Sequence, residues 1–172
     1  WIIHLAVCEK IIRVYRDSNY AIKGLWDRCG ELIDAMYEGR EETVGPLRTG
    51  KNCVYLPNGM RLLYRDLERD DEGNYSYLRR KEGRVQRGKI YSSALTENFC
   101  QALAGAYVKE AMARMWIKYG IRTVLQVHDE VVAIVPKAEA KEAFEKIMEC
   151  MKTVPKWAKG LPLDAEGDIG ES

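Results

Sequence analysis

The chain has 172 residues and a formal net charge of +1, and 47% of its residues are hydrophobic. This length suits one domain, or a core with an appended lobe, and the hydrophobic share is enough for a packed core. The near-zero charge excludes a global attraction to nucleic acid or membrane, although a local basic stretch can still attract either.

The first part of the chain predicts two helices. Apolar positions within 2–16 favour one helix, Asp-Ser-Asn at 17–19 interrupts it, and a second helix is expected to end at Gly39. The second helix has the clearest period in the chain, with an apolar stripe at Ile22, Leu25, Trp26, Cys29, Leu32, Ile33, Met36 and Tyr37. We expect the two helices to form a hairpin with a buried seam. The apolar stretch WIIHLAVC is short and has no basic residues ahead of it, so we expect it to be neither a signal peptide nor a membrane-spanning helix.

The middle of the chain, about 44–92, changes to strand and turn patterns. Residues 54–64 predict a strand hairpin closed by a Pro-Asn-Gly turn, and a second turn at 70–73 precedes a strand pattern at 75–78. The run that follows, 79–89, is basic. It is able to bind backbone phosphate, and an exposed charged hairpin explains it equally well.

The last part predicts, in order, a long helix, a strand hairpin, another helix and a short strand. Their expected bounds are 96–119, 123–135, 138–152 and 161–163. Thr96 is expected to cap the long helix and Gly120 to end it. Helices and strands do not alternate in strict βαβ order, so we predict an α+β fold, with an antiparallel sheet packed by helices on one face.

The five cysteines are widely spaced and form no CxxC or Cys/His pair, so a zinc site is not expected. Cys29, Cys100 and Cys150 lie within helical patterns and are expected to be buried thiols. Free thiols of this kind fit a reducing, intracellular setting.

The turn formed by His128, Asp129 and Glu130 is the strongest candidate site. The two flanking strands are rich in β-branched residues, so they hold a carboxylate rigidly while it faces solvent. A hard divalent cation prefers oxygen ligands, and two cations can stabilise the attacking and leaving oxygens of nucleotidyl transfer. His128 is able to donate to a phosphate oxygen beside such a metal. From spacing alone, an ordinary solvated turn is the simpler explanation, and the sequence has no HEXXH, Walker, GxGxxG or GxSxG motif.

Longer segments around this turn resemble family A DNA polymerases. VLQVHDEVV (124–132), which follows the helix TENFCQALAGAYVKEAM (96–112), resembles the C-terminal part of that family in its phage-type and bacterial DNA polymerase I-like branch. Three further segments resemble the family in the same order: YRDSNYAIKGLW (15–26), YLPNGMRLLY (55–64) and VPKWAKGLPLDAEG (154–167). The resemblance covers most of the chain. It implies a helical hairpin of the distal fingers over 1–45 and a C-terminal palm part over 46–172.

The resemblance implies a role for each matching residue. Asp129 corresponds to the aspartate that binds the catalytic Mg²⁺ ions, Glu130 to its neighbour that supports the metal site or primer end, and His128 to the histidine near the primer terminus. Gln101 corresponds to the glutamine that contacts the minor-groove edge of the primer–template end, where acceptors recur at every base pair. Without the family, a partly exposed helical glutamine is the simpler explanation of Gln101.

Tyr91, Glu97 and Asn98 are further candidates for DNA contact. Phage-type relatives carry a similar Tyr-Gly-Gly-Lys and Glu-Asn before the glutamine, whereas residues 91–94 here are Tyr-Ser-Ser-Ala. The cellular branch has an arginine and an asparagine where this sequence has Ser93 and Glu97. Part of the family's duplex contact is therefore changed in this chain.

The family's motif A, which resembles D-Y-S-x-x-E-x-R, and its nucleotide-binding fingers helix do not occur in this sequence. Motif A supplies the second metal-binding aspartate, so this chain is expected to be a piece of a longer polypeptide and not to polymerise alone. The implied function is template-dependent transfer of nucleotidyl units from a dNTP to a primer 3′-OH. The implied partners are primer–template DNA, dNTP and the remainder of the polymerase, with no membrane, in bacterial cytoplasm or the host cytoplasm of a phage. The alternatives are a non-catalytic DNA-binding module derived from the palm, and a plain structural domain with a charged turn.

Overall fold

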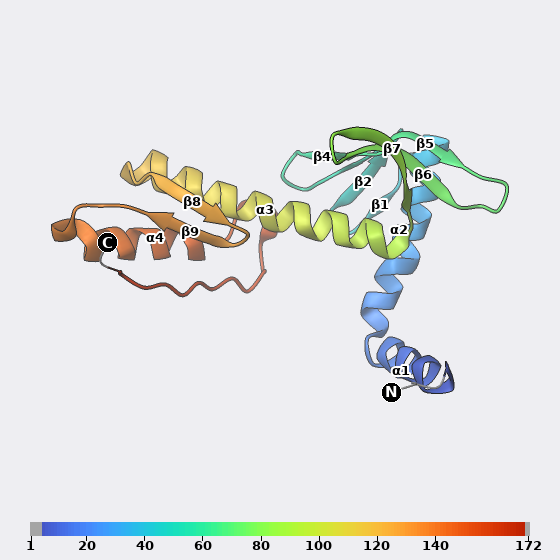
Figure 1. Ribbon diagram of the computed structural model, residues 1–172, viewed down its shortest axis with the longest axis horizontal. Coiled ribbons are helices and arrows are strands. Elements are labelled where there is room, and N and C mark those ends of the chain that lie inside the picture. The colour runs from blue at the N-terminus through green and yellow to red at the C-terminus, as the bar shows by residue number, and fades with distance from the viewer. Residues whose placement is uncertain (1–4, 171–172) are drawn as a thin grey trace. The chain divides into compact units, whose positions relative to one another are not determined.

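A computed structural model describes residues 5–170, and Figure 1 labels its helices and strands. The chain is α+β, with antiparallel sheets packed by helices, as predicted. It divides into two compact units, Trp1–Phe99 and Cys100–Ser172. The predicted functional boundary near residue 45 stays a prediction. No helix in the described residues is long and apolar enough to cross a membrane.

The elements follow one another in this order: α1 (Leu5–Ser18), α2 (Tyr20–Glu38), β1 (Thr43–Val44), β2 (Leu47–Gly50), β3 (Cys53–Tyr55), β4 (Arg61–Leu63), β5 (Arg65–Arg69), β6 (Tyr75–Lys81), β7 (Arg84–Ile90), α3 (Ser92–Tyr119), β8 (Thr123–Val127), β9 (Glu130–Ala133), the 3-10 helix η1 (Lys137–Glu139), α4 (Ala140–Lys152) and the 3-10 helix η2 (Lys156–Ala158).

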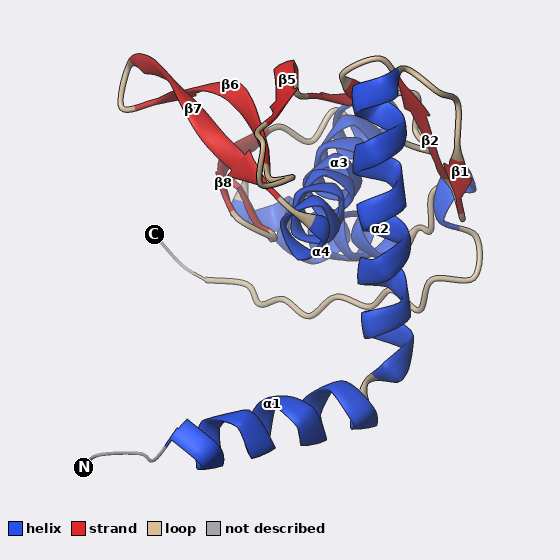
Figure 2. Ribbon diagram, turned by 90° about the vertical axis from the view of Figure 1, so that its right-hand side faces the viewer, coloured by secondary structure: helices blue, strands red, loops and turns tan. Residues whose placement is uncertain are grey.

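The helical hairpin α1–α2 (Figure 2) forms as predicted. Its seam is not buried. α2 ends at Gly39, whose φ of 80° lies in the left-handed region that glycine adopts without a Cβ penalty. In contrast, α1 has no buried residue, and Ile11 is 60% exposed. The predicted buried seam is therefore wrong, because the apolar stripe of α1 has no partner within residues 5–170. The predicted start of this helix at residue 2 lies outside the described residues.

The core of the first unit includes the C-terminal half of α2, where the predicted stripe is buried. The largest fully buried side chains of this unit come from α2, from β2 and β3, and from the first turn of α3: Leu32, Ile33, Met36, Leu47, Val54 and Leu95. Thr49 is the buried polar residue beside them. Its hydroxyl accepts a hydrogen bond from the Glu42 N–H at 2.8 Å and donates one to the Arg40 carbonyl at 2.9 Å, so its burial leaves no polar atom unsatisfied.

Two antiparallel sheets belong to the first unit. The first has the order β1-β2-β3-β4, and the predicted Pro-Asn-Gly turn joins β3 to β4. The second has the order β5-β6-β7, and the predicted turn at 70–73 joins β5 to β6. β7 was not predicted because its sequence, RVQRGKI, is largely polar. β1 and β2 were also missed, since they have only two and four residues.

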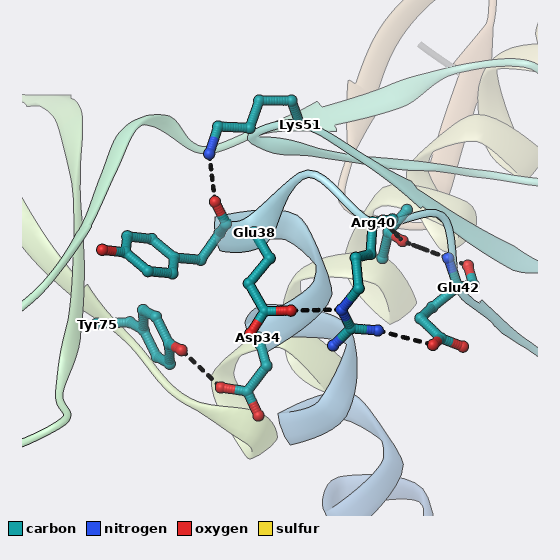
Figure 3. A network of polar contacts seen from close by, with 8 residues as sticks. Asp34, Glu38, Arg40, Glu42, Lys51 and Tyr75 are labelled. Carbon is teal, nitrogen blue, oxygen red and sulfur yellow. Dashed lines mark hydrogen bonds and ion pairs between the residues drawn. The ribbon is translucent and has the colours of Figure 1, made fainter.

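Polar contacts anchor both sheets to the C-terminal end of α2 (Figure 3). Tyr75 of β6 donates a hydrogen bond to Asp34 Oδ1 at 2.5 Å, and its ring lies against the ring of Tyr37 with centroids 5.6 Å apart. The Lys51 ammonium, between β2 and β3, donates to the backbone carbonyl of Tyr37. Figure 3 also shows two ion pairs just after the helix, Arg40–Glu38 and Arg40–Glu42. One helix end thus contacts the β2–β3 turn of the first sheet and strand β6 of the second.

Tyr64, between β4 and β5, is expected to make the stability of the first unit fall at alkaline pH. It is 2% exposed, and Asn98 Nδ2 donates a hydrogen bond to its hydroxyl at 3.0 Å. Burial raises the pKa of Tyr64 to about 12. The folded protein therefore keeps a proton that the unfolded chain releases near its ordinary pKa of 10.0. The contribution of this proton to the free energy of unfolding is complete below about pH 10. It is lost as the pH rises to about 12, and the loss reaches about 3 kcal/mol.

Urea unfolding between about pH 9 and about pH 12 measures this loss. Tyr64→Phe is expected to flatten the decline, whatever its effect on stability at neutral pH. Tyr20→Phe is the matched control, because Tyr20 is 78% exposed, and it should keep the decline of the parent protein. Equal slopes for the parent and Tyr64→Phe would contradict the prediction.

The second unit packs the rest of α3, the β8–β9 hairpin and α4 around a small core. Its buried members are Ala111, Met115, Ile121, Ala143 and Cys150. The segment after α4 is attached by side chains: Trp157 Nε1 donates a hydrogen bond to Glu110 Oε1 at 2.7 Å, and Lys152 pairs with Asp164 at 2.7 Å. Gly120 ends α3, as predicted.

Three predictions for the chain from α3 onward are wrong. α3 begins at Ser92, so Thr96 lies inside the helix, where its hydroxyl donates to the Ser92 carbonyl at 3.0 Å. Cys100 is exposed, because the face of α3 that buries Phe99 turns it outward. Residues 161–163 form no strand: Pro162 cannot donate to a ladder, and no described strand pairs with the segment.

Arg114 of α3 stabilises the C-terminal end of α4. One guanidinium nitrogen donates to the carbonyls of Cys150 and Thr153 at 2.9 and 3.1 Å. The last carbonyls of a helix have no partner within it, and a cation there also complements the helix dipole. Arg114→Met is therefore expected to lower the free energy of unfolding by about 1–3 kcal/mol, measured by urea denaturation. Lys109→Met, at an exposed position of the same helix, should leave it nearly unchanged. Similar losses in the two variants would show that Arg114 has no special role.

Candidate active-site turn

The predicted turn lies in the second unit, between β8 and β9. Glu130 already belongs to β9 and pairs with Val127, so His128 and Asp129 form a two-residue loop. His128 has a φ of 51°, a left-handed conformation that costs about 1–2 kcal/mol for a residue with a Cβ. Histidine adopts it more often than most residues, and backbone strain of this kind is concentrated at functional sites.

One face of the β8–β9 hairpin is packed and the other is open. Val131 and Ala133 pack against the core of the second unit. The residues of β9 that alternate with Val131 and Ala133 point to the opposite face, and directly paired residues of two strands share a face. The open face therefore consists of Leu125, Val127, Glu130 and Val132. Its three apolar residues are 45–55% exposed, so nothing in residues 5–170 covers this face.

The two carboxylates of the turn are unpaired. Asp129 and Glu130 are exposed, and neither side chain has a hydrogen bond or an ion pair within the described part of the chain. The described residues form no group of three or more His, Cys, Asp or Glu side chains that could hold a metal ion. Mg²⁺ takes hard oxygen ligands and often only one or two carboxylates from a protein. The turn therefore supplies donors of the right kind for part of a Mg²⁺ site.

Gln126 is a residue of the site that the sequence did not reveal. Its side-chain Nε2 donates a hydrogen bond to the backbone carbonyl of His128 at 2.6 Å. The bond closes the loop from the β8 side and holds the backbone that carries Asp129. No sequence signal predicts it, because a glutamine at an exposed strand position commonly faces water.

The other predicted site residues lie elsewhere. Gln101 is an exposed residue of α3 and, like the turn, belongs to the second unit. Asn98 and Tyr91 belong to the first unit, where the Asn98 amide donates to Tyr64 and Tyr91 is 60% exposed. Asn98 thus has an internal structural contact that the sequence did not indicate. The DNA contacts expected of all three residues stay predictions.

No protein-family model and no solved structure matches the chain. A DNA polymerase of Bacillus phage SP02 is 37% identical to the chain over 173 residues, which cover 93% of this chain and 26% of that polymerase. The chain thus spans about a quarter of the length of the curated relative that it matches. This similarity supports the expected relation to part of a DNA polymerase.

Proposed function

We propose that the chain is the distal fingers and C-terminal palm part of a family A, template-dependent DNA polymerase. The observation that carries the proposal is the pair of exposed, unpaired carboxylates, Asp129 and Glu130, on a hairpin turn held by a packed core. The 37% identity to a phage DNA polymerase extends over 93% of the chain and supports the assignment. The reaction is transfer of a nucleotidyl unit from a dNTP to a primer 3′-OH.

In this proposal Asp129 holds Mg²⁺, and Glu130 supports the metal site or the primer end. A pair of Mg²⁺ ions supplies electrostatic stabilisation of the attacking and leaving oxygens. Gln126 and the packed face of the hairpin fix the position of the Asp129 backbone. His128 lies beside the primer terminus, and Gln101 contacts the minor-groove edge of the primer–template end.

In the proposal the second metal-binding carboxylate comes from outside this chain, because the sequence contains no pattern like D-Y-S-x-x-E-x-R, which supplies that aspartate in the family. The open face of β8–β9 supports this division, since its apolar residues need a cover that residues 5–170 do not provide. We assign that cover to the remainder of the polymerase. The chain alone is then inactive.

Primer extension tests the proposal. Three proteins are assayed with Mg²⁺ and dNTPs. They are the complete polymerase, its Asp129→Asn variant, and the 172-residue chain alone. Extension by the complete enzyme that depends on Asp129, and none by the chain alone, supports the assignment. Extension that does not need Asp129 would refute it and favour the non-catalytic DNA-binding module.

A further inference from the structure

The free end of the β6–β7 hairpin extends beyond its sheet. β5 pairs with β6 only from Tyr75 as far as Leu78, whereas β6 and β7 pair from Tyr75 to Lys81. The two strands therefore continue as a two-stranded ribbon that a two-residue turn closes, and Figure 2 shows this ribbon projecting past β5. The turn residues, Glu82 and Gly83, have φ values of 52° and 75°, as in the type I′ turns of tight hairpins.

Three cations share one face of this ribbon. Arg79 and Lys81 are alternate residues of β6, and Arg84 lies directly opposite Lys81 on β7. We call Arg79, Lys81 and Arg84 the cationic face. Gly88 leaves room for the Arg79 side chain on this side of the sheet, since a Cβ at that position would overlap it. Like charges directly opposite each other destabilise a strand pair, so the arrangement has a cost within the fold.

Nothing within the described chain offsets that cost. None of the three cations has a hydrogen bond or an ion pair in residues 5–170, and all three are exposed. Arg87, which lies on β7 like Arg84, differs from the three cations. It points to the opposite face and pairs with Asp66 at 2.8 Å and with Glu68 at 2.9 Å. The charge of Arg87 is therefore neutralised. The free end of the hairpin, residues 79–86, carries four cations and one carboxylate, Glu82, and so keeps an excess of positive charge.

We propose that the cationic face binds the sugar–phosphate backbone of duplex DNA without reading its sequence. The inference rests on the proposed polymerase function, which supplies DNA as the polyanion. Arginine presents its donors in a fork that matches phosphate oxygens, and lysine adds a point charge. The ribbon end has no aromatic residue for stacking on bases, and the side chain opposite Arg79 is a glutamine. The surface therefore offers charge and backbone hydrogen bonding.

Fluorescence anisotropy with labelled DNA tests the proposal on the 172-residue chain. Two duplexes of unrelated sequence are titrated over a range of salt concentrations with the parent and with Arg79→Gln/Lys81→Gln/Arg84→Gln. Each phosphate contact contributes about 0.9 to the slope of log affinity against log salt, so the slope is expected to fall by about 2–3 with both duplexes. The thermal midpoint should not fall, because the change removes like-charge repulsion.

The matched control is Lys10→Gln/Arg13→Gln/Arg16→Gln, which removes the same charge from exposed, unpaired residues of α1. Its slope of log affinity against log salt should differ from that of the parent by no more than about 0.9, the value of one phosphate contact. The hairpin assignment would be overturned if the slope fell equally in the two triple variants, or if it fell with only one of the two duplexes. It would also be overturned if the parent did not bind duplex DNA. Hairpin-dependent binding to phosphatidylserine vesicles without binding to DNA would overturn it as well. The polymerase proposal depends instead on Asp129 and survives these outcomes if extension requires that residue.

Discussion

Asp129→Asn in the complete polymerase is expected to lower kcat for primer extension by about 10²–10³-fold or more, because it removes a charged ligand from the proposed metal site. The substitution keeps the size and shape of the side chain. Asp129 makes no hydrogen bond or ion pair in the described residues, so the folded state loses no internal contact. The free energy of unfolding should therefore change by less than about 0.5 kcal/mol.

Binding of primer–template separates a catalytic role from a structural one. Because the proposal places the Asp129 charge near DNA phosphates, removing that charge should leave the affinity for DNA unchanged or slightly higher while extension is lost. Asp71→Asn is the control, since Asp71 is an exposed, unpaired residue of the β5–β6 turn. It should leave extension near normal. A large loss of DNA affinity or of stability in Asp129→Asn would point to a structural role.

Leu32→Ala is expected to lower the free energy of unfolding by about 2–5 kcal/mol. Leu32 lies on α2, is 0% exposed and belongs to the largest fully buried side chains. The substitution removes buried methyl groups and leaves a cavity in a close-packed core, and both effects destabilise the folded state. Urea unfolding followed by circular dichroism measures the loss.

Ile11→Ala on α1 is the informative control for Leu32→Ala. Both residues lie on apolar helical stripes that the sequence predicts to be buried, yet Ile11 is 60% exposed. Its truncation should change the free energy of unfolding by less than about 0.5 kcal/mol. A loss as large as that of Leu32→Ala would mean that α1 packs in solution on a surface absent from residues 5–170.

Local sequence signals predicted the elements whose cause is local. The stripe of α2, the turn at 57–59 and the charged turn between β8 and β9 each depend on periodicity or turn residues within a few positions. The position of the acidic pair on an exposed turn is predictable for the same reason, because the pair lies between two apolar strands in the sequence, while its role as a site stays a prediction.

Features that depend on distant partners were missed or mispredicted. α1 and α2 have similar apolar stripes, and only contacts elsewhere decide that one is buried and the other exposed. β7 is a strand because it pairs with β6 over seven residues, which its polar composition does not reveal. The bonds from Asn98 to Tyr64 and from Arg114 to the end of α4 join residues more than thirty positions apart, so no local pattern indicates them.

Under the proposed function, the open face of the β8–β9 hairpin also affects how tightly the turn binds Mg²⁺. A two-stranded hairpin is marginal by itself, and here the core restrains it from one side only. Whatever covers Leu125, Val127 and Val132 will restrict the motion of the neighbouring carboxylates before any cation arrives. When the carboxylates that bind an ion are ordered in advance, less entropy is lost on binding. In the proposed polymerase, packing on this open face therefore tunes the affinity for Mg²⁺ without changing a metal ligand.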